Sequence, residues 1–244
     1  MYFRTFSKLI VSFCSFAFLT SCDILGTGPC IEGSGTVKTE TRDLPAFRGV
    51  DMRIAGNVYI TGGSTNEVRI ESFSNLLPQI TTEVIGNTLV IRSESCLEYD
   101  NDEASVYITL PSIENVELKS SGMIRVQTVP SAQKLNVNLS GSGTIRYLGS
   151  IPKMNLLLSG SGDIILEGFV NHLETNSSGS GRIQGYFLHT DTAFVRSTGS
   201  GHQQIWVDKY LDATLSGSGN IYYRGYPNLI STLTSGSGKV INDN

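Results

Sequence analysis

A repeat of about nineteen residues is the feature of this 244-residue chain that most restricts its fold. The motif Ser-Gly-Ser-Gly, or a close variant of it, recurs through the C-terminal half of the chain. When the copies are aligned on their last glycine, the successive spacings are 21, 19, 19, 20, 18 and 19 residues, for Gly122, Gly143, Gly162, Gly181, Gly201, Gly219 and Gly238. Such a period indicates one supersecondary unit that stacks on copies of itself.

Each repeat shows the alternation of a half-buried β-strand on both sides of the glycine motif. Before the motif, apolar residues occupy every second position, as in Met154, Leu156 and Leu158. Two residues after the aligned glycine, six of seven copies have a β-branched apolar residue, in the series Ile124, Ile145, Ile164, Ile183, Gln203, Ile221, Val240. We therefore predict a strand, a Ser-Gly corner, a second strand and a looser turn in every repeat. We expect the corner glycines to supply positive φ angles.

A unit this short has no room for the crossover helix of a dozen or so residues that usually joins parallel strands. Equivalent strands must pair directly with those of the next repeat. This predicts an all-β chain with a single-stranded parallel β-helix over residues 112–244, built from coils of about 19 residues. Leucine-rich repeats and calcium-binding nonapeptide repeats are disfavoured, because the first lack their fixed Asn or Cys here and the second lack their recurring Asp.

Residues 33–111 contain strand-like runs without the regular period. The runs cover residues 50–54, 58–60, 68–70, 88–91 and 106–110, and glycine-asparagine pairs mark turns between some of them. We expect them to form irregular N-terminal β coils. Residues 33–244 would then be one continuous domain.

The first 21 residues have the character of a secretory signal. Arg4 and Lys8 precede a short apolar run over residues 9–19, which spans only about 16 Å as a helix and is too short for a bilayer core of about 30 Å. The sequence Leu19-Thr20-Ser21-Cys22 resembles a bacterial lipobox. That resemblance implies cleavage before Cys22 and lipidation of its thiol, whereas an ordinary cleavage site beside a cysteine is the alternative.

Lipidation of Cys22 would make residues 22–32 a tether to a membrane. Several acyl chains hold a protein at a bilayer without any spanning helix, because each buried CH₂ contributes about 0.8 kcal/mol. We therefore expect an exported protein, lipid-anchored to the bacterial cell envelope. The expected location is the outer membrane, and the sequence leaves open which face carries the anchor.

The charge of the chain argues against a nucleic-acid partner. Lys and Arg number 18 and Asp and Glu 22, so the formal net charge is −4. Removal of residues 1–21 takes away two basic residues and changes the net charge to −6. Nucleic-acid-binding domains show a positive excess instead.

Two cysteines, Cys30 and Cys96, would remain beside the lipidated one. Export permits a disulfide between them, but two cysteines have no spacing pattern that decides the matter, so pairing and free thiols both stay open. No His/Cys cluster accompanies them, and we expect neither a metal site nor a cofactor.

Catalytic motifs are not apparent in the sequence. The Gly-x-Gly corners are followed by strands, whereas a phosphate-binding loop opens a helix. His172, His189 and His202 stand at different distances from their aligned glycines, which argues against a stacked histidine cluster. Polysaccharide lyases also use parallel β-helices, but no acid-rich column adjoins a basic one here. We therefore predict no enzymatic activity.

One outward column is a candidate contact site. Five residues after the aligned glycine, Tyr186, Trp206 and Arg224 are expected on successive coils about 4.8 Å apart. Aromatic rings beside a guanidinium can bind a sugar face or a partner protein. The competing interpretation is a ladder that only braces the sheet, or burial under a loop.

Several segments together resemble a known family. They are Phe-Arg-Gly-Val at 47–50, Gly-Asn-Val-Tyr-Ile at 56–60, the repeated corners, and Ile-Tyr-Tyr-Arg-Gly-Tyr-Pro at 221–227. Over roughly residues 45–240 the chain is similar to the "putative auto-transporter adhesin, head GIN domain" family. The resemblance implies a right-handed β-helix, an extracytoplasmic location and an adhesive role, and it transfers no catalytic motif.

Taken together, these patterns predict a non-enzymatic, lipid-anchored envelope protein. Its β-helix would bind a surface glycan or protein, or would associate with further copies as a homo-oligomer, because exposed strand edges recruit partners. The alternative is a carbohydrate-binding or polysaccharide-processing protein of the same shape.

Overall fold

The computed structural model describes residues 29–99, 104–130 and 133–244. The predicted signal segment and Cys22 lie outside these residues, as does most of the predicted tether. Among the residues that are described, no helix has the length and apolar character needed to cross a membrane.

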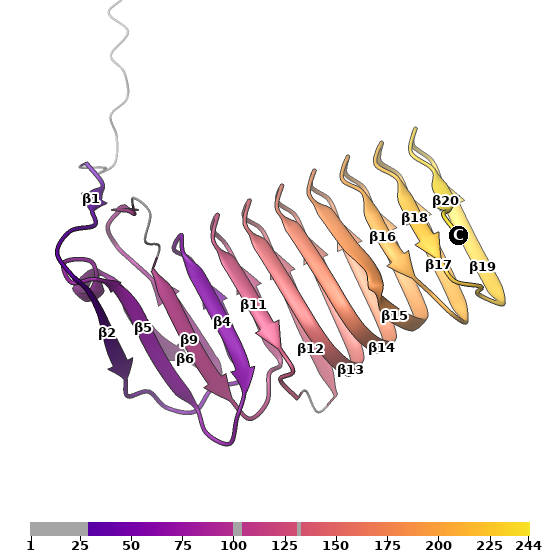
Figure 1. The fold of residues 1–244 in the computed structure, drawn as a ribbon. Helices are drawn as coiled ribbons and strands as arrows, with labels where there is room; N and C mark the ends of the chain where they lie inside the picture. Colours follow the sequence, from indigo (N-terminus) through magenta and orange to yellow (C-terminus); the bar gives the residue numbers. More distant parts are fainter. Residues whose placement is uncertain (1–28, 100–103, 131–132) are drawn as a thin grey trace, which may run out of the picture.

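The described chain is almost entirely β-structure (Figure 1). In chain order its elements are β1 (Ile31–Glu32), β2 (Val37–Arg42), β3 (Gly49–Met52), β4 (Asn57–Gly62), β5 (Glu67–Phe73), the 3₁₀ helix η1 (Leu77–Gln79), β6 (Thr81–Ile85), β7 (Thr88–Arg92), β8 (Leu97–Glu98), β9 (Ser105–Leu110), β10 (Asn115–Leu118), β11 (Met123–Gln127), β12 (Lys134–Leu139), β13 (Thr144–Leu158), β14 (Asp163–Ser177), β15 (Arg182–Ser197), β16 (Gln203–Trp206), β17 (Tyr210–Leu215), β18 (Ile221–Arg224), β19 (Leu229–Thr234) and β20 (Val240–Asn242).

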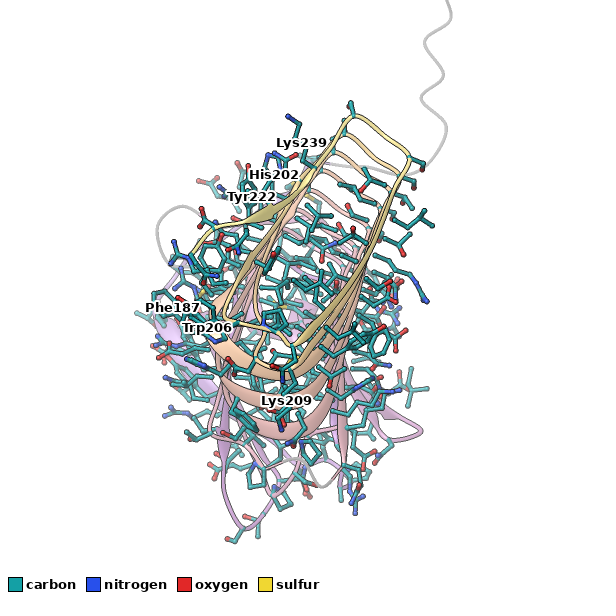
Figure 2. All side chains as sticks on the ribbon, turned by 90° about the vertical axis from the view of Figure 1, so that its right-hand side faces the viewer. Phe187, His202, Trp206, Lys209, Tyr222 and Lys239 are labelled. Carbon is teal, nitrogen blue, oxygen red and sulfur yellow. A yellow bond between two sulfur atoms is a disulfide. The ribbon has the colours of Figure 1, made fainter. Side chains whose placement is uncertain are left out.

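Strands β10–β20 form the predicted parallel solenoid, with coils of about 20 residues. Each coil has two long walls that meet at the Ser-Gly corner (Figure 2). Wall A consists of the strands that lead into the corner: β10, β12, the second parts of β13, β14 and β15, then β17 and β19. Wall B consists of the strands that leave it: β11, the first parts of β13, β14 and β15, then β16, β18 and β20. The predicted parallel β-helix is confirmed.

The N-terminal strands extend both walls in a different order and make a near-barrel sheet. β3 and β4 lie directly beside β10 and β11, and β7 and β9 lie beyond them, all in parallel. Three pairings are antiparallel: β5 with β9, β2 with β5, and β6 with β7. The less regular character predicted for this region is confirmed, but the repeat gave no indication of antiparallel pairs.

The apolar column of wall B fills the interior as predicted. Five isoleucines of this column are fully buried and lie in register on successive coils: Ile124, Ile145, Ile164, Ile183 and Ile221. Each buried aliphatic side chain of this kind stabilises the fold by roughly 1.5–3 kcal/mol.

Gln203, which interrupts the apolar column in sequence, is also fully buried and in register with Ile183 and Ile221. Its Oε1 accepts a hydrogen bond from the Thr175 hydroxyl at 2.6 Å, and its Nε2 donates to the Arg196 carbonyl at 2.9 Å. A polar residue is tolerated in the core because both ends of its amide are satisfied.

The corner glycines allow neighbouring coils to approach closely. A Cβ added to Gly181 would lie 2.1 Å from the carbonyl oxygen of Gly162, and one added to Gly201 would lie 1.9 Å from that of Gly181. The expectation of positive φ at these corners is wrong. Among the described glycines, positive φ angles occur elsewhere, at Gly35, Gly56, Gly86, Gly168 and Gly225.

The N-terminal end of the described chain is tied to β8. Cys30 and Cys96, 66 positions apart, form a disulfide in the structure, and the adjoining strands β1 and β8 pair in parallel. Closing a loop of this length restricts the unfolded chain and stabilises the fold by about 4 kcal/mol in the chain-entropy account.

We expect Gly181→Ala to lower the free energy of unfolding by about 3 kcal/mol, because the methyl group must push two coil backbones apart. Gly86→Ala is the matched control: its φ is +63°, nothing lies within 4 Å of the added Cβ, and only the left-handed backbone opposes it, at about 1 kcal/mol. Urea denaturation measures both. Equal losses would show that close approach is not what requires glycine at the corners.

Candidate functional site

The three residues predicted as a contact column all lie on wall B, but the structure does not stack them in one row. Trp206 in β16 is directly in register with Arg224 in β18. Tyr186 lies in an irregular part of β15, where the register to β14 shifts between Ile165 and Glu167. One extra residue of β15 is accommodated there, so Phe187 is the residue that pairs with Glu167.

Tyr186 and Arg224 contact each other. The Arg224 guanidinium lies 4.1 Å from the centre of the Tyr186 ring. Asp243 joins them, since its Oδ2 accepts hydrogen bonds from the Tyr186 hydroxyl at 2.8 Å and from Arg224 Nη2 at 3.0 Å. Both partners are therefore engaged within the protein, and this cluster braces the last coils.

These contacts shift the pKa values of the acid and the phenol in opposite directions. The hydrogen bond from Tyr186, followed by the one from Arg224, lowers the pKa of Asp243. Desolvation, followed by the hydrogen bond to Asp243, raises the pKa of Tyr186. Because the pKa of Asp243 is lower in the folded state, its contribution to stability is present at neutral pH and is lost as acid protonates it.

Trp206 turns toward a different group. Its Nε1 donates to Asp208 Oδ1 at 2.8 Å, and its ring centre lies 4.5 Å from that of His189. Phe187 points into solvent with 77% of its surface exposed, and it lies two residues before His189 on the same outward side of β15. Figure 2 shows it at the same side of the coil as Trp206. We call Phe187, His189 and Trp206 the aromatic ledge.

Phe187 was not among the residues predicted from sequence. The spacing of 20 residues between Gly181 and Gly201 was the available signal, because a bulge moves every later side chain of the strand by one place.

A pocket of about 310 Å³ lies next to the ledge on wall B. The paired residues Gln184 and Gln204 line it, together with His202 and Tyr222. Asn220 orients the last two: its backbone N–H donates to His202 Nδ1 at 2.9 Å, and its Nδ2 donates to the Tyr222 hydroxyl at 2.9 Å. The pocket therefore combines amides with an aromatic ring, as sites for polar organic ligands do.

A larger groove of about 430 Å³ runs along wall A and is lined by five asparagines on four strands, Asn115, Asn136, Asn138, Asn155 and Asn176. Some of these amides are paired: Asn136 Nδ2 donates to Asn115 Oδ1 at 2.9 Å, and Asn138 Nδ2 donates to Glu117 Oε1 at 2.8 Å. The Oδ1 atoms of Asn138 and Asn155 are buried and accept no hydrogen bond from the described residues. We call this the asparagine groove.

Within the described ranges, the histidines make no nucleophile–base pair. His202 accepts from a backbone amide, His189 lies 3.7 Å from Asp208, and His172 packs on Phe194. In the same residues no group of three or more His, Cys, Asp or Glu side chains is placed to hold a metal ion.

Comparison with known proteins identifies the relatives of this chain. The family described as "putative auto-transporter adhesin, head GIN domain" matches residues 46–227. A search of curated proteins found no match.

Among solved structures, a "putative adhesin" from Bacteroides fragilis is 23% identical, with a TM-score of 0.76 over 86% of this chain and 98% of its own. A "putative adhesin" from Parabacteroides merdae is 20% identical and a "putative lipid binding protein" from Parabacteroides distasonis 21% identical, each with a TM-score of 0.65 over 87% of this chain and 99% of its own. At these identities the structures share the fold.

We expect Asp243→Asn to lower the pKa of Tyr186 toward that of an ordinary tyrosine. The substitution removes the carboxylate that accepts the phenolic hydrogen bond and opposes ionisation. NMR of ring-labelled tyrosines during an alkaline titration measures this value. Asp191→Asn, which removes a carboxylate paired with Lys209 instead, should leave it unchanged. A Tyr186 pKa that is the same in Asp243→Asn and wild type would contradict the cluster.

Proposed function

The chain belongs to the family described as "putative auto-transporter adhesin, head GIN domain", and on that premise we propose that it is a non-enzymatic protein of the bacterial cell envelope that holds a surface partner against the sides of its β-solenoid. Family membership supports an adhesive role.

The aromatic ledge is the observation that carries the proposal. Phe187 exposes 77% of its surface, and near it the tilted rings of Trp206 and His189 lie in contact at the surface. Aromatic side chains on a rigid support are frequent anchors of interfaces, because they bury a large area and lose little conformational freedom on binding. A sugar face or an apolar protein surface would cover this ledge.

We place the protein at the membrane through lipid on Cys22. The lipobox-like sequence before this residue supports the assignment. The described strands begin only at Ile31, which leaves a short segment between the anchor and the fold. The solenoid would then be displayed from the outer membrane.

The asparagine groove favours a second candidate function, the binding of neutral carbohydrate. Side-chain amides both donate and accept hydrogen bonds, and sugar hydroxyls do the same. The side-chain amide of Asn176 makes no hydrogen bond with the other described residues that line the groove, so a hydroxyl-rich ligand can pair with it. The exposed apolar side chain of Leu157 lines the same groove and offers contacts to C–H faces.

Self-association is a further part of the proposal. β19 pairs with β17, and within the described residues no strand covers its other edge. Leu229, Ile230 and Leu233 of this strand are exposed. An open strand edge with apolar side chains favours pairing with a second copy.

We expect Trp206→Ala to weaken binding to the surface partner, found by screening a glycan array and an envelope extract, while the fold is retained. Trp206 is the only tryptophan of the chain, so its fluorescence reports occupancy of the ledge directly. Tyr210→Ala is the matched control, because this ring packs against Phe194 on wall A. Unchanged binding by Trp206→Ala would remove the ledge from consideration, and release of a cleaved product would refute the non-enzymatic proposal.

Cys22→Ala should release the protein from membranes into the aqueous phase of a detergent partition. The control is Cys14→Ala, a cysteine within the predicted signal, which should partition like wild type. Retention of Cys22→Ala in the detergent phase would show that this cysteine carries no anchor.

A further inference from the structure

The arginines of the described chain fall into two groups. Seven have a carboxylate partner: Arg42, Arg48, Arg53, Arg92, Arg182, Arg196 and Arg224. Arg69, Arg125 and Arg146 are all exposed and have no acidic partner among the described residues. Arg69 instead places its guanidinium 4.6 Å from the centre of the Tyr107 ring.

The three unpaired arginines lie in one row on wall B. Arg69 is in register with Tyr107, Tyr107 with Tyr59, Tyr59 with Arg125, and Arg125 with Arg146. The two tyrosine rings are stacked, with centres 5.3 Å apart and planes 18° from parallel. We call these five residues the arginine–tyrosine row. It runs along the solenoid axis across five neighbouring strands, β5, β9, β4, β11 and β13.

The surroundings of the row leave its central positive charges uncompensated. The outward neighbours of Tyr59, Arg125 and Arg146 are neutral on both sides: Asn57, Met123 and Thr144 on one, Thr61, Gln127 and Leu148 on the other. Acidic residues occur toward the ends, as Glu67 and Glu71 beside Arg69, and as Asp163 and Glu167 on β14 beyond Arg146. Asp163 is already paired with Arg182. Like charges directly opposite each other in a sheet repel and destabilise it. An anion bound between Arg125 and Arg146 would relieve this repulsion.

Two hollows adjoin the same guanidinium. Arg146 lines one of about 170 Å³ together with Asn57 and Thr144, and another of about 80 Å³ together with Arg125 and Glu167. The larger hollow has no acidic residue in its lining and is the one suited to an anion. These hollows are too small for a whole macromolecule but have room for a charged substituent that projects from a chain. Guanidinium groups bind carboxylate and sulfate oxygens through paired, charge-assisted hydrogen bonds.

We propose that the arginine–tyrosine row binds a linear acidic polysaccharide. The sugar rings lie against the edges of the Tyr59 and Tyr107 rings, whose faces contact each other and Arg69. The carboxylate or sulfate groups of the polymer pair with Arg125 and Arg146. A polymer fits better than a single anion because the cationic and aromatic groups repeat about every 4.8 Å along one line. The negative net charge of the whole chain disfavours nucleic acid, whose binding depends on a general positive excess. This site is separate from the aromatic ledge.

Biolayer interferometry with the purified protein in detergent tests the proposal. The immobilised probes are polygalacturonate, which carries carboxylates, dextran sulfate, which carries sulfate esters, and uncharged dextran. We expect binding to one or both charged polymers, weakened by salt, and none to dextran. Which charged polymer binds more tightly identifies the anionic group.

The variant R125Q/R146Q should weaken binding about tenfold or more, because it removes both guanidinium forks. The matched control R48Q/R196Q removes the same charge from arginines that already have acidic partners, and should change affinity less than about twofold. R125K/R146K keeps the charges and should bind more tightly than R125Q/R146Q. Tyr59→Leu should weaken binding without changing its salt dependence.

Several outcomes would overturn the proposal. They are equal affinity of R125Q/R146Q and wild type for the charged polymers, equal affinity of the lysine and glutamine double variants, comparable binding to dextran, or tighter binding to single-stranded polyuridylate than to either polysaccharide. Because Trp206 lies outside the row, Trp206→Ala should bind the charged polymers like wild type. Loss of one site therefore leaves the other measurable.

Discussion

Contact between successive corner backbones is the constraint on which the rest of this structure depends. The amide of Asp163 donates to the Gly143 carbonyl at 3.0 Å, and that of Arg182 to the Gly162 carbonyl at 3.1 Å. A side chain at any of these glycines would occupy the space of the neighbouring backbone. The corners therefore fix both the spacing and the register of the coils. Because of that register, each inward or outward side chain lies in a row with its counterparts in the neighbouring coils.

The regular half of the fold could be predicted because its constraint is visible as a period in the sequence. The inward isoleucines and the parallel pairing both follow from that period. The prediction that the corner glycines supply positive φ angles was wrong, because the sequence alone does not distinguish a need for positive φ from a lack of space for a side chain. The N-terminal strands were less predictable for a different reason. Their order depends on pairing between distant segments, such as β3 with β10 and β2 with β5, and no local pattern encodes those partners.

For the candidate contact residues, the position in the repeat predicts the wall on which a residue lies but not the partners that its side chain contacts. Tyr186, Trp206 and Arg224 do lie on wall B, but long side chains reach beyond their own coil. Tyr186 reaches Asp243, 57 residues later in the chain, and the bulge in β15 leaves Phe187 as the most exposed ring of the ledge. The arginine–tyrosine row was not identifiable from the repeat either. Tyr59 meets Arg125, 66 positions later in the chain, only because β4 pairs with β11.

A surface built in this way suits the recognition of extended partners, because stacked coils place their outward side chains along a line. On wall B the chemistry changes along that line, from arginine and tyrosine near β4 and β11 to glutamine, histidine and tryptophan near β16. The strands hold these side chains in place before any partner arrives, so little ordering cost falls on the protein when a long ligand binds. Successive weak contacts along one polymer then add as linked events, which is how modest individual interactions produce firm attachment.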